Sequence, residues 1–194
     1  MLRLLAALAA PSWSSDDRVI RIAARVQDGA LRLEGTTRPL GVDPRRWRAI
    51  SAPNRHPGAS PTSAAKAAAR APFEEAARAA SDAGVDEAVL FDAADFAVEG
   101  ARTNLIVAAA DGTLRTPPLA RGAQAGIARE LLLERVPELR EGDVSRAELG
   151  TAVEILAANA VRGVRAIARL DGRSVGNGVP GEWAERLARA FARP

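Results

Sequence analysis

The sequence predicts an α+β fold in which short strands alternate with a few amphipathic helices. In several segments apolar residues recur at every second position, the spacing of a strand with one face in the core. Residues 72–83, 126–136 and 182–191 instead carry apolar residues at helical spacing. Because tight-turn signals such as Asp-Gly separate many of these segments, we expect hairpins rather than a doubly wound parallel sheet.

The N-terminal region contains a predicted β-hairpin. Residues 18–26 and 30–38 alternate apolar and polar side chains on either side of Asp28-Gly29. The first ten residues combine one arginine with a short apolar run. They fit either a minimal secretory signal or an amphipathic helix that ends near Pro11.

A proline-rich segment separates two predicted lobes. Residues 39–61 hold five prolines and two glycines, which predicts a linker or long loop broken by a short strand at 47–51. We therefore expect an N-terminal lobe at residues 1–52, a linker at 53–61 and a C-terminal lobe at 62–194.

The C-terminal lobe is predicted to begin with a helix. Residues 63–83 are rich in alanine and charged at helical spacing, and Pro72 favours a start of the helix proper near that residue. Ser145 and Glu148 form the capping box of a further short helix. The strands predicted in this lobe are residues 87–92, 96–98, 104–109, 114–116, 153–156 and 164–170.

The composition argues against several classes of function. The net charge is +3 and basic residues are spread among acidic ones, which does not suit a nucleic-acid-binding surface. The chain has no cysteine, which excludes disulfides and thiolate chemistry. Its single histidine, His56, excludes a metal site built from several histidines. No segment is long enough to span a bilayer.

Lys66 is the one lysine among 27 basic residues. A lysine amine can form a Schiff base once burial or a neighbouring cation lowers its pKa, whereas an arginine guanidinium cannot. Alanines flank Lys66 on both sides, a setting that favours a desolvated amine. The alternative is compositional, because an arginine-rich chain can retain one surface lysine that has no role.

Two further segments carry candidate chemistry. Glu99 is followed by Gly100 and, later, Asn104 between two predicted strands, which places a carboxylate at a tight turn. This carboxylate is either a solvated hairpin residue or a group that faces the ring nitrogen of a pyridoxal-phosphate cofactor. Gly126 and Ile127 open a predicted helix, and a helix N-terminus that begins at glycine suits a phosphate group.

Together and in this order, these segments resemble the class IV aminotransferases, which include branched-chain and D-amino-acid aminotransferases and aminodeoxychorismate lyase. The resemblance covers roughly residues 58–182. The matching segments are Asp86-Glu87-Ala88-Val89-Leu90, Glu99 to Asn104, Thr116-Pro117-Pro118-Leu119, Gly126-Ile127-Ala128-Arg129 and Asn159-Ala160-Val161-Arg162-Gly163-Val164. Arg70, four residues after Lys66, matches an arginine often found in lyase-like members.

The resemblance implies a D-amino-acid-aminotransferase-like fold with a truncated N-terminal α/β lobe, a C-terminal pseudo-barrel lobe and the cofactor pyridoxal 5′-phosphate (PLP). It implies that Lys66 forms the Schiff base with PLP and moves a proton during catalysis. Glu99 is expected to pair with the pyridine nitrogen, and the backbone amides of Ile127 and Ala128 with the phosphate. The full set of expected cofactor-binding residues is Lys66, Arg70, Glu99, Asn104, Gly126, Ile127, Ala128 and Asn159, and no metal ligand is expected.

The sequence departs from the family pattern in the expected cofactor pocket. Ala128 stands where the family usually has threonine, and the chain has no tyrosine to contact the phenolic oxygen of PLP. The family's phosphate-binding arginine belongs to a His-x-x-Arg-Leu helix that has no clear match ahead of the hairpin. A naturally short chain, a misassigned start and a degenerate homologue are the three explanations that stay open.

The resemblance implies a PLP-dependent aminotransferase that acts on a small amino acid. One alternative is an aminodeoxychorismate lyase that releases p-aminobenzoate, which Arg70 and the Asn159 segment favour. Another is a non-catalytic PLP-binding homologue, which alanine at polar pocket positions favours. We further expect a cytoplasmic homodimer with no nucleic-acid or membrane partner.

Overall fold

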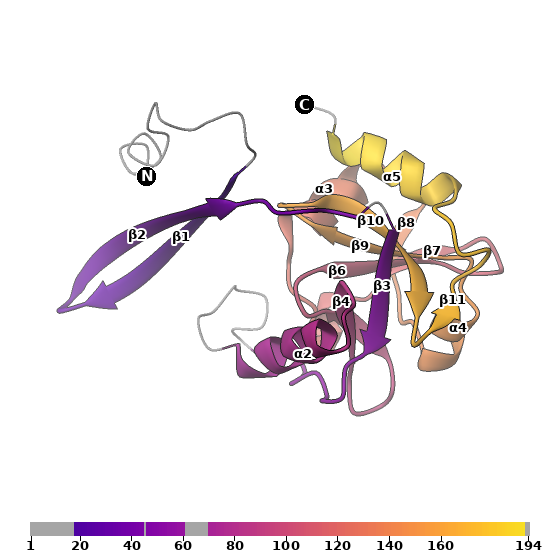
Figure 1. The fold of residues 1–194 in the computed structure, drawn as a ribbon, viewed down its shortest axis with the longest axis horizontal. Helices are drawn as coiled ribbons and strands as arrows, with labels where there is room; N and C mark the ends of the chain where they lie inside the picture. Colours follow the sequence, from indigo (N-terminus) through magenta and orange to yellow (C-terminus); the bar gives the residue numbers. More distant parts are fainter. Residues whose placement is uncertain (1–17, 45, 61–69, 193–194) are drawn as a thin grey trace. The chain divides into compact units, whose positions relative to one another are not determined.

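A computed structural model describes residues 18–44, 46–60 and 70–192 (Figure 1). Its contacts divide the chain into two units, Met1–Asp43 and Pro44–Pro194, and each is described by itself. Three predictions fall outside the described residues. They concern Lys66, the segment at residues 1–10 and the first part of the helix predicted at 63–83.

The described part of the first unit contains the predicted hairpin. Strand β1 (Arg18–Gln27) pairs antiparallel with β2 (Ala30–Pro39). The two turn residues, Asp28 and Gly29, have φ angles of 51° and 73°. Positive φ at both central residues gives the twist that a two-residue hairpin turn needs, which explains the Asp-Gly pair. The hairpin prediction is therefore confirmed.

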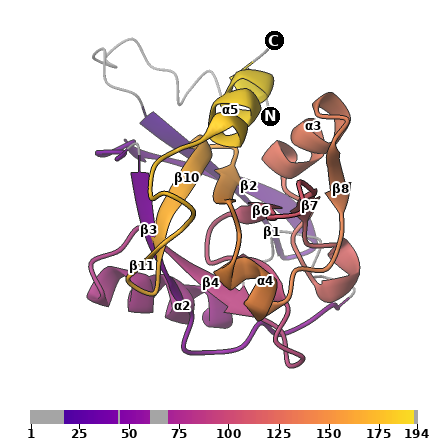
Figure 2. The ribbon, with the colours of Figure 1, turned by 90° about the vertical axis from the view of Figure 1, so that its right-hand side faces the viewer.

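The second unit is built on a mixed nine-stranded sheet that curls on itself (Figure 2). Strand β3 pairs in parallel with both β4 and β10, and β7 pairs in parallel with β8, whereas the other pairs are antiparallel. The order in the sheet is β5 (Ala97–Gly100), β4 (Glu87–Phe91), β3 (Arg46–Ser51), β10 (Gly163–Leu170), β9 (Glu154–Asn159), β6 (Asn104–Ala108), β7 (Leu114–Thr116) and β8 (Leu139–Glu141), with β11 (Arg173–Ser174) beside β10. The mixed topology confirms the α+β prediction.

The α-helices begin where the sequence signals predicted. Helix α2 (Ala71–Asp82) has a proline, Pro72, in its first turn, where a missing backbone N–H costs nothing. Helix α4 (Arg146–Gly150) is preceded by the complete capping box of Ser145 and Glu148. The remaining helices are the 3₁₀ turn η1 (Leu119–Arg121), α3 (Ile127–Arg135) and α5 (Glu182–Ala192).

The central strands are buried on both faces, which explains why they read as continuous apolar runs. On β6, Leu105 and Val107 join the cluster on one side of the sheet, and Ile106 joins the cluster packed beneath α3 and α5. Helix α2 covers β4 with Ala76 and Ala80, which lie in one cluster with Leu90 (Figure 1). Strand β5, which carries Glu99, pairs antiparallel with the β4 strand that α2 covers.

Two details of the fold differ from the sequence prediction. Glu99 and Gly100 are strand residues, because β5 runs to Gly100, and the irregular turn occupies residues 101–103 instead. Strand β3 belongs with the second unit, since its backbone pairs with β4 and β10. The contacts therefore divide the chain before β3, and not within residues 53–61.

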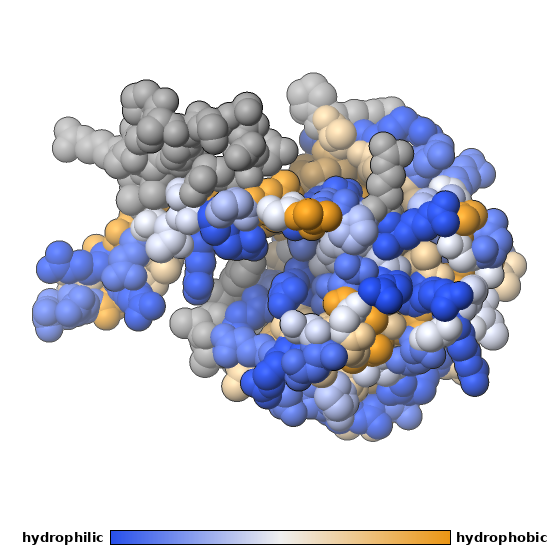
Figure 3. All heavy atoms as spheres, in the orientation of Figure 1, coloured by the Kyte–Doolittle hydropathy of each residue, from blue (hydrophilic) through white to orange (hydrophobic). Residues whose placement is uncertain are grey.

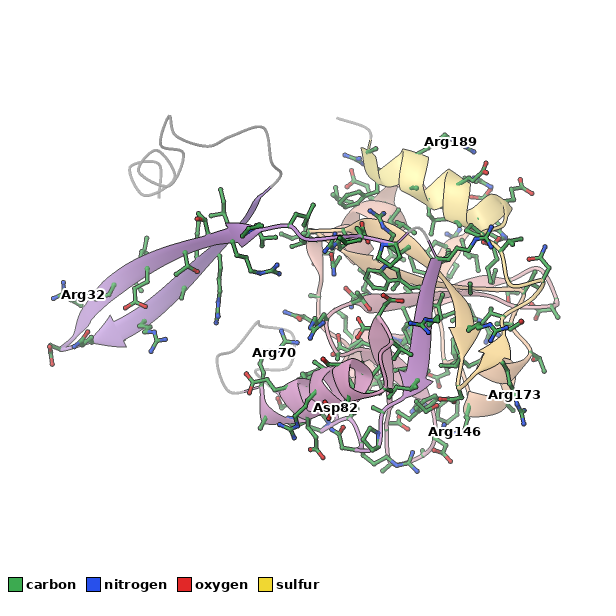
Figure 4. All side chains as sticks on the ribbon, in the orientation of Figure 1. Arg32, Arg70, Asp82, Arg146, Arg173 and Arg189 are labelled. Carbon is green, nitrogen blue, oxygen red and sulfur yellow. The ribbon has the colours of Figure 1, made fainter. Side chains whose placement is uncertain are left out.

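The face of the second unit in Figure 3 is mostly hydrophilic, with small scattered apolar patches. The labelled side chains Arg32, Arg146, Arg173 and Arg189 come from β2, α4, β11 and α5, respectively (Figure 4). None of the helices in the described residues is long and apolar enough to cross a membrane.

Candidate functional site

Glu99 is a buried carboxylate on β5, with 3% of its surface exposed. Its Oε1 lies 3.1 Å from Nε2 of His56, and its Oε2 accepts a hydrogen bond from the backbone N–H of Gln124 at 3.1 Å. His56 precedes Glu99 by 43 residues and Gln124 follows it by 25. The carboxylate is thus held between distant segments of the chain and is not a solvated hairpin residue.

The His56 ring is fixed by its surroundings. Its side chain is fully buried, and its edge packs against the ring of Phe73 at a centroid distance of 5.4 Å. The backbone N–H of Gly58 donates to Nδ1 at 3.0 Å, so Nδ1 carries a lone pair. A neutral ring that accepts at Nδ1 carries its proton on Nε2, the atom that faces Glu99.

The loop that carries His56 packs closely on the turn after η1. Gly58 has a φ of 83°, and a Cβ added at Gly122 would lie 2.5 Å from the Gly58 carbonyl carbon. Arg121 anchors the same turn by donating to both carboxyl oxygens of Asp143 and to Asp92. The Arg121 guanidinium also holds the pKa of Asp143 below its ordinary value. This packing positions the segment that leads to Gln124.

Gln124 is the residue on which three predicted site residues converge. Its N–H donates to Glu99, and its carbonyl accepts a hydrogen bond from Asn104 Nδ2 at 2.8 Å. Its side-chain oxygen accepts a longer hydrogen bond from Arg70, at 3.4 Å. Arg70 also donates to the Ala101 carbonyl at 3.4 Å, and Figure 4 shows it at the start of α2. Gln124 therefore joins Glu99, Asn104 and Arg70 in one arrangement.

Asn104 and Gly126 lie in direct contact. A Cβ added at Gly126 would collide with the side-chain oxygen of Asn104, so this position requires glycine. Asn104 is itself buried, with 6% of its surface exposed. The two positions were predicted separately as cofactor residues, and the structure shows that each fixes the other.

Helix α3 presents an N-terminus that no side chain caps. Gly126 is its N-cap residue, in an extended conformation, and makes no side-chain hydrogen bond to the first turn. Ile127 is exposed and Ala128 is buried. Because the first amides of a helix have no partner inside the helix and lie at its positive end, they suit an anionic group.

Asn159 stabilises the turn between β9 and β10. Its Oδ1 accepts hydrogen bonds from the backbone N–H groups of Val161 and Arg162, at 3.0 and 2.7 Å. Its Nδ2 donates to the Arg102 carbonyl at 3.3 Å, which ties this turn to the one after Gly100. Its contacts within the protein are those of a turn residue, and its proposed contact with a cofactor stays a prediction.

A second buried glutamate, Glu87 on β4, lies beside the turn at residues 101–103. It accepts hydrogen bonds from Thr103 Oγ1 at 2.8 Å and from the backbone N–H groups of Ala88 and Arg102. Burial raises the pKa of Glu87 above its ordinary value, although these hydrogen bonds oppose the rise. A Cβ at Gly100 would lie 2.8 Å from the Glu87 carboxyl carbon, so the glycine of the motif makes room for this side chain.

The structure thus places most of the predicted site residues together. Arg70, Asn104 and Glu99 meet at Gln124, the Gly126-Ile127-Ala128 helix start follows it, and Asn159 is connected through Arg102. Lys66 lies outside the described residues. Within the described part of the chain, no cluster of three or more histidine and carboxylate side chains could hold a metal ion.

Sequence reasoning missed two residues of this site, His56 and Gln124. His56 offered one signal, since it is the single histidine of the chain. Gln124 offered none, because its role depends mainly on its backbone N–H and carbonyl.

Comparison with known proteins adds a second line of evidence. A family model described as amino-transferase class IV matches residues 3–170. A putative branched-chain-amino-acid aminotransferase of Methanocaldococcus jannaschii is 32% identical over 113 residues, which cover 56% of this chain and 39% of that protein. The chain therefore spans well under two thirds of the length of this relative.

Solved structures share the fold. A branched-chain aminotransferase from Thermoproteus uzoniensis, solved with norvaline, is 25% identical with a TM-score of 0.78, covering 90% of this chain and 63% of that one. The branched-chain amino acid aminotransferase of Escherichia coli is 26% identical with a TM-score of 0.75, covering 84% and 56%.

Proposed function

Because this chain belongs to the class IV aminotransferase family, we propose that it binds PLP through Lys66 and transfers the amino group of a small amino acid. In this proposal PLP is bound by the residues expected from the sequence, which are Lys66, Arg70, Glu99, Asn104, Gly126, Ile127, Ala128 and Asn159. The activity is a proposal because the match to the relative named above covers only 39% of that relative's length.

The observation that carries the proposal is the environment of Glu99. Among the described residues its hydrogen-bond partners are the His56 ring and the backbone N–H of Gln124, and neither is an arginine or a lysine. A buried carboxylate is costly unless a cation also meets it. The protonated ring nitrogen of PLP is such a cation, so the residues present fit the pyridine end of the cofactor.

The phosphate end of PLP fits the start of α3. The backbone amides of Ile127 and Ala128 lie in the first turn of that helix, where an anion is favoured. Asn104 braces this helix start through its contact with Gly126 and its bond to the Gln124 carbonyl. The same few residues thereby connect the two ends of the proposed cofactor site.

When bound, PLP supplies a conjugated ring that accepts the electrons released at the α-carbon of the substrate. Glu99 keeps the ring nitrogen protonated, which increases this capacity. Lys66 holds the cofactor and carries the proton from the substrate α-carbon, because it is the one side-chain amine of the chain.

We propose an aliphatic, branched-chain amino acid as the substrate. The support is that the relatives and solved structures named above are branched-chain aminotransferases. The lyase alternative stays a prediction. Arg70, which suggested it, donates within the described residues to Gln124 and Ala101.

The attachment of PLP can be tested at a single residue. Protein incubated with PLP should gain a visible absorbance band, and borohydride should fix the cofactor on the peptide that contains Lys66. Lys66→Arg keeps the charge but cannot form the bond, so the band should be lost. A wild-type protein that stays colourless would overturn the proposal.

The reaction can be tested in single half-reactions. PLP-loaded protein mixed with leucine, isoleucine or valine should yield pyridoxamine phosphate and the corresponding keto acid. Aminodeoxychorismate should yield no pyruvate. Pyruvate and p-aminobenzoate, with no keto acid formed from leucine, isoleucine or valine, would instead support the lyase. A coloured protein that turns over neither kind of substrate would support the non-catalytic homologue.

We also propose that the active protein is a homodimer in the cytoplasm, as the family resemblance implies. Light scattering of the PLP-loaded protein should give twice the mass of one chain. A monomer with full activity would contradict the dimer, and fractionation of cells that express the protein checks its location.

A further inference from the structure

His56 occupies a position that the family pattern did not indicate and that the proposed reaction does not yet use. It is the single histidine of the chain, its side chain is fully buried, and it lies against the carboxylate assigned to the cofactor ring. We propose that His56 is a positioning residue, which holds Glu99 toward the ring nitrogen of PLP by donating a hydrogen bond from a neutral ring. This inference rests on the proposed function.

The direction of the hydrogen bond follows from the other side of the ring. Nδ1 accepts the backbone N–H of Gly58 at 3.0 Å, and a nitrogen that accepts cannot also carry a proton. The ring is therefore neutral and protonated on Nε2. That proton points to Glu99 Oε1, 3.1 Å away. A doubly protonated ring would lose the Gly58 contact.

The ring is also held mechanically. The His56 backbone N–H donates to the Phe91 carbonyl at 2.8 Å, and Phe73 packs against the ring edge. The Gly58 backbone in turn contacts Gly122 so closely that a side chain there would collide. A donor fixed on several sides keeps its acceptor in one orientation, which a mobile side chain or a water would not do.

A neutral donor serves Glu99 differently from a charged one. An arginine at this position would form an ion pair with Glu99 and would itself neutralise the carboxylate. The imidazole and the Gln124 amide instead stabilise the ionised carboxylate by hydrogen bonds and leave its charge for a cation. Nearly all the basic residues of this chain are arginines, since its 27 lysines and arginines include one lysine. The residue beside the buried Glu99 carboxylate is nevertheless the single histidine.

Two substitutions separate the two hydrogen bonds of the ring. His56→Gln places an amide nitrogen near the position of Nε2 and can still donate to Glu99. His56→Asn reaches only the position of Nδ1, so it can keep the Gly58 contact but not the Glu99 contact. Each variant thus loses one polar contact and serves as the control for the other.

The expected readouts are PLP affinity and the half-reaction rate, measured for folded protein as judged by circular dichroism. His56→Gln should stay within about threefold of wild type in the PLP dissociation constant, because the bond to Glu99 is retained. His56→Asn should bind PLP about tenfold more weakly and react more slowly at saturating substrate, with its visible band displaced. Equal behaviour of the two variants would overturn the positioning role.

A measurement on the unmodified sequence covers the case in which a variant fails to fold. Protein labelled with ¹⁵N-histidine and purified without a histidine tag gives signals from His56 alone. The spectrum should show a neutral ring protonated on Nε2, and Glu99→Gln should shift that proton. A cationic ring, or a ring protonated on Nδ1, would contradict the proposal.

The spectrum requires no PLP, which separates the two proposals. A protein that takes up no PLP overturns the proposed function, and with it the role of His56 toward the cofactor. A protein that takes up PLP but shows the wrong ring form overturns only the role of His56.

Discussion

Two buried glutamates on neighbouring strands, Glu87 on β4 and Glu99 on β5, differ in where their hydrogen-bond donors come from. The donors to Glu87 are its own neighbour Ala88 and the adjacent turn residues Arg102 and Thr103. The donors to Glu99 lie on two loops, one of them before α2 and the other before α3.

The comparison shows that burial by itself does not identify a functional carboxylate. Glu87 is as buried as Glu99, yet its hydrogen bonds stabilise the neighbouring turn at residues 101–103. Gly100 leaves room for the Glu87 side chain because it has no Cβ. Glu99 instead contacts two segments that are far apart in the sequence, through His56 and Gln124. The second of these segments leads directly into α3. Both residues belong to the family motifs, but the structure gives them different tasks.

The largest expected effect is a difference in half-reaction rate between variants of the two glutamates. Glu99→Gln should lower the half-reaction rate by on the order of 10²-fold, because the ring nitrogen loses its anionic partner. Glu87→Gln should leave the rate within about threefold. Stopped-flow measurement of the two PLP-loaded variants checks this. Equal losses would mean that the two carboxylates are not functionally distinct.

The next effect concerns the fit of Gly100 against Glu87. Gly100→Ala should reduce the free energy of unfolding by about 1–3 kcal/mol, because the added Cβ meets the Glu87 carboxyl and Thr103. Gly150→Ala is the control, since nothing lies within 4 Å of its Cβ and alanine favours the helix. Urea denaturation measures both, and a neutral Gly100→Ala would refute the packing argument.

The raised pKa of Glu87 predicts a pH dependence of stability. Since folding raises this pKa above the ordinary value of 4.5, the folded state favours the protonated form. Relative to Glu87→Gln, wild type should be most stable below pH 4.5 and should lose that advantage as the pH rises through the raised pKa. The loss cannot exceed about 1.4 kcal/mol per pH unit. Urea denaturation of both proteins at several pH values from about 4 to about 8 checks the sign of this stability difference.

The smallest effect has the opposite sign, at the partly exposed Glu148. Hydrogen bonds from Ser145, and then from Arg115, lower the pKa of Glu148 to about 2. Relative to Glu148→Gln, wild type should be more stable above pH 4.5 and lose this advantage as the pH falls toward 2. The advantage should stay below about 1 kcal/mol, because the carboxylate is largely in water. Thermal unfolding at several acidic pH values measures it, and a rising advantage at low pH would contradict the assignment.

Local signals in the sequence were enough to locate most elements of the fold. The Asp28-Gly29 turn, the start of α2 at Pro72 and the capping box of Ser145 each depend on residues within one turn of the chain. The very short strands β8 and β11 were not predicted. Their pairing partners, β7 and β10, define them.

The candidate site was predicted only in part. Motifs identified Glu99, Asn104 and Gly126, because these residue types recur at fixed spacing in the family. They did not reveal that Asn104 needs glycine at 126 or that Gln124 connects the set. Those relations depend on the close approach of β6 and the loop before α3, which sequence spacing does not encode.

By itself, the sequence determined the residue types that chemistry requires, with one lysine, one histidine and a glutamate in a family motif. The tertiary structure decided which of two buried glutamates faces distant donors and which proton position the His56 ring adopts. The physical reason is that a hydrogen bond needs its two atoms at about 3 Å. Only the folding of β3, β5 and the loop before α3 around one core brings those atoms together.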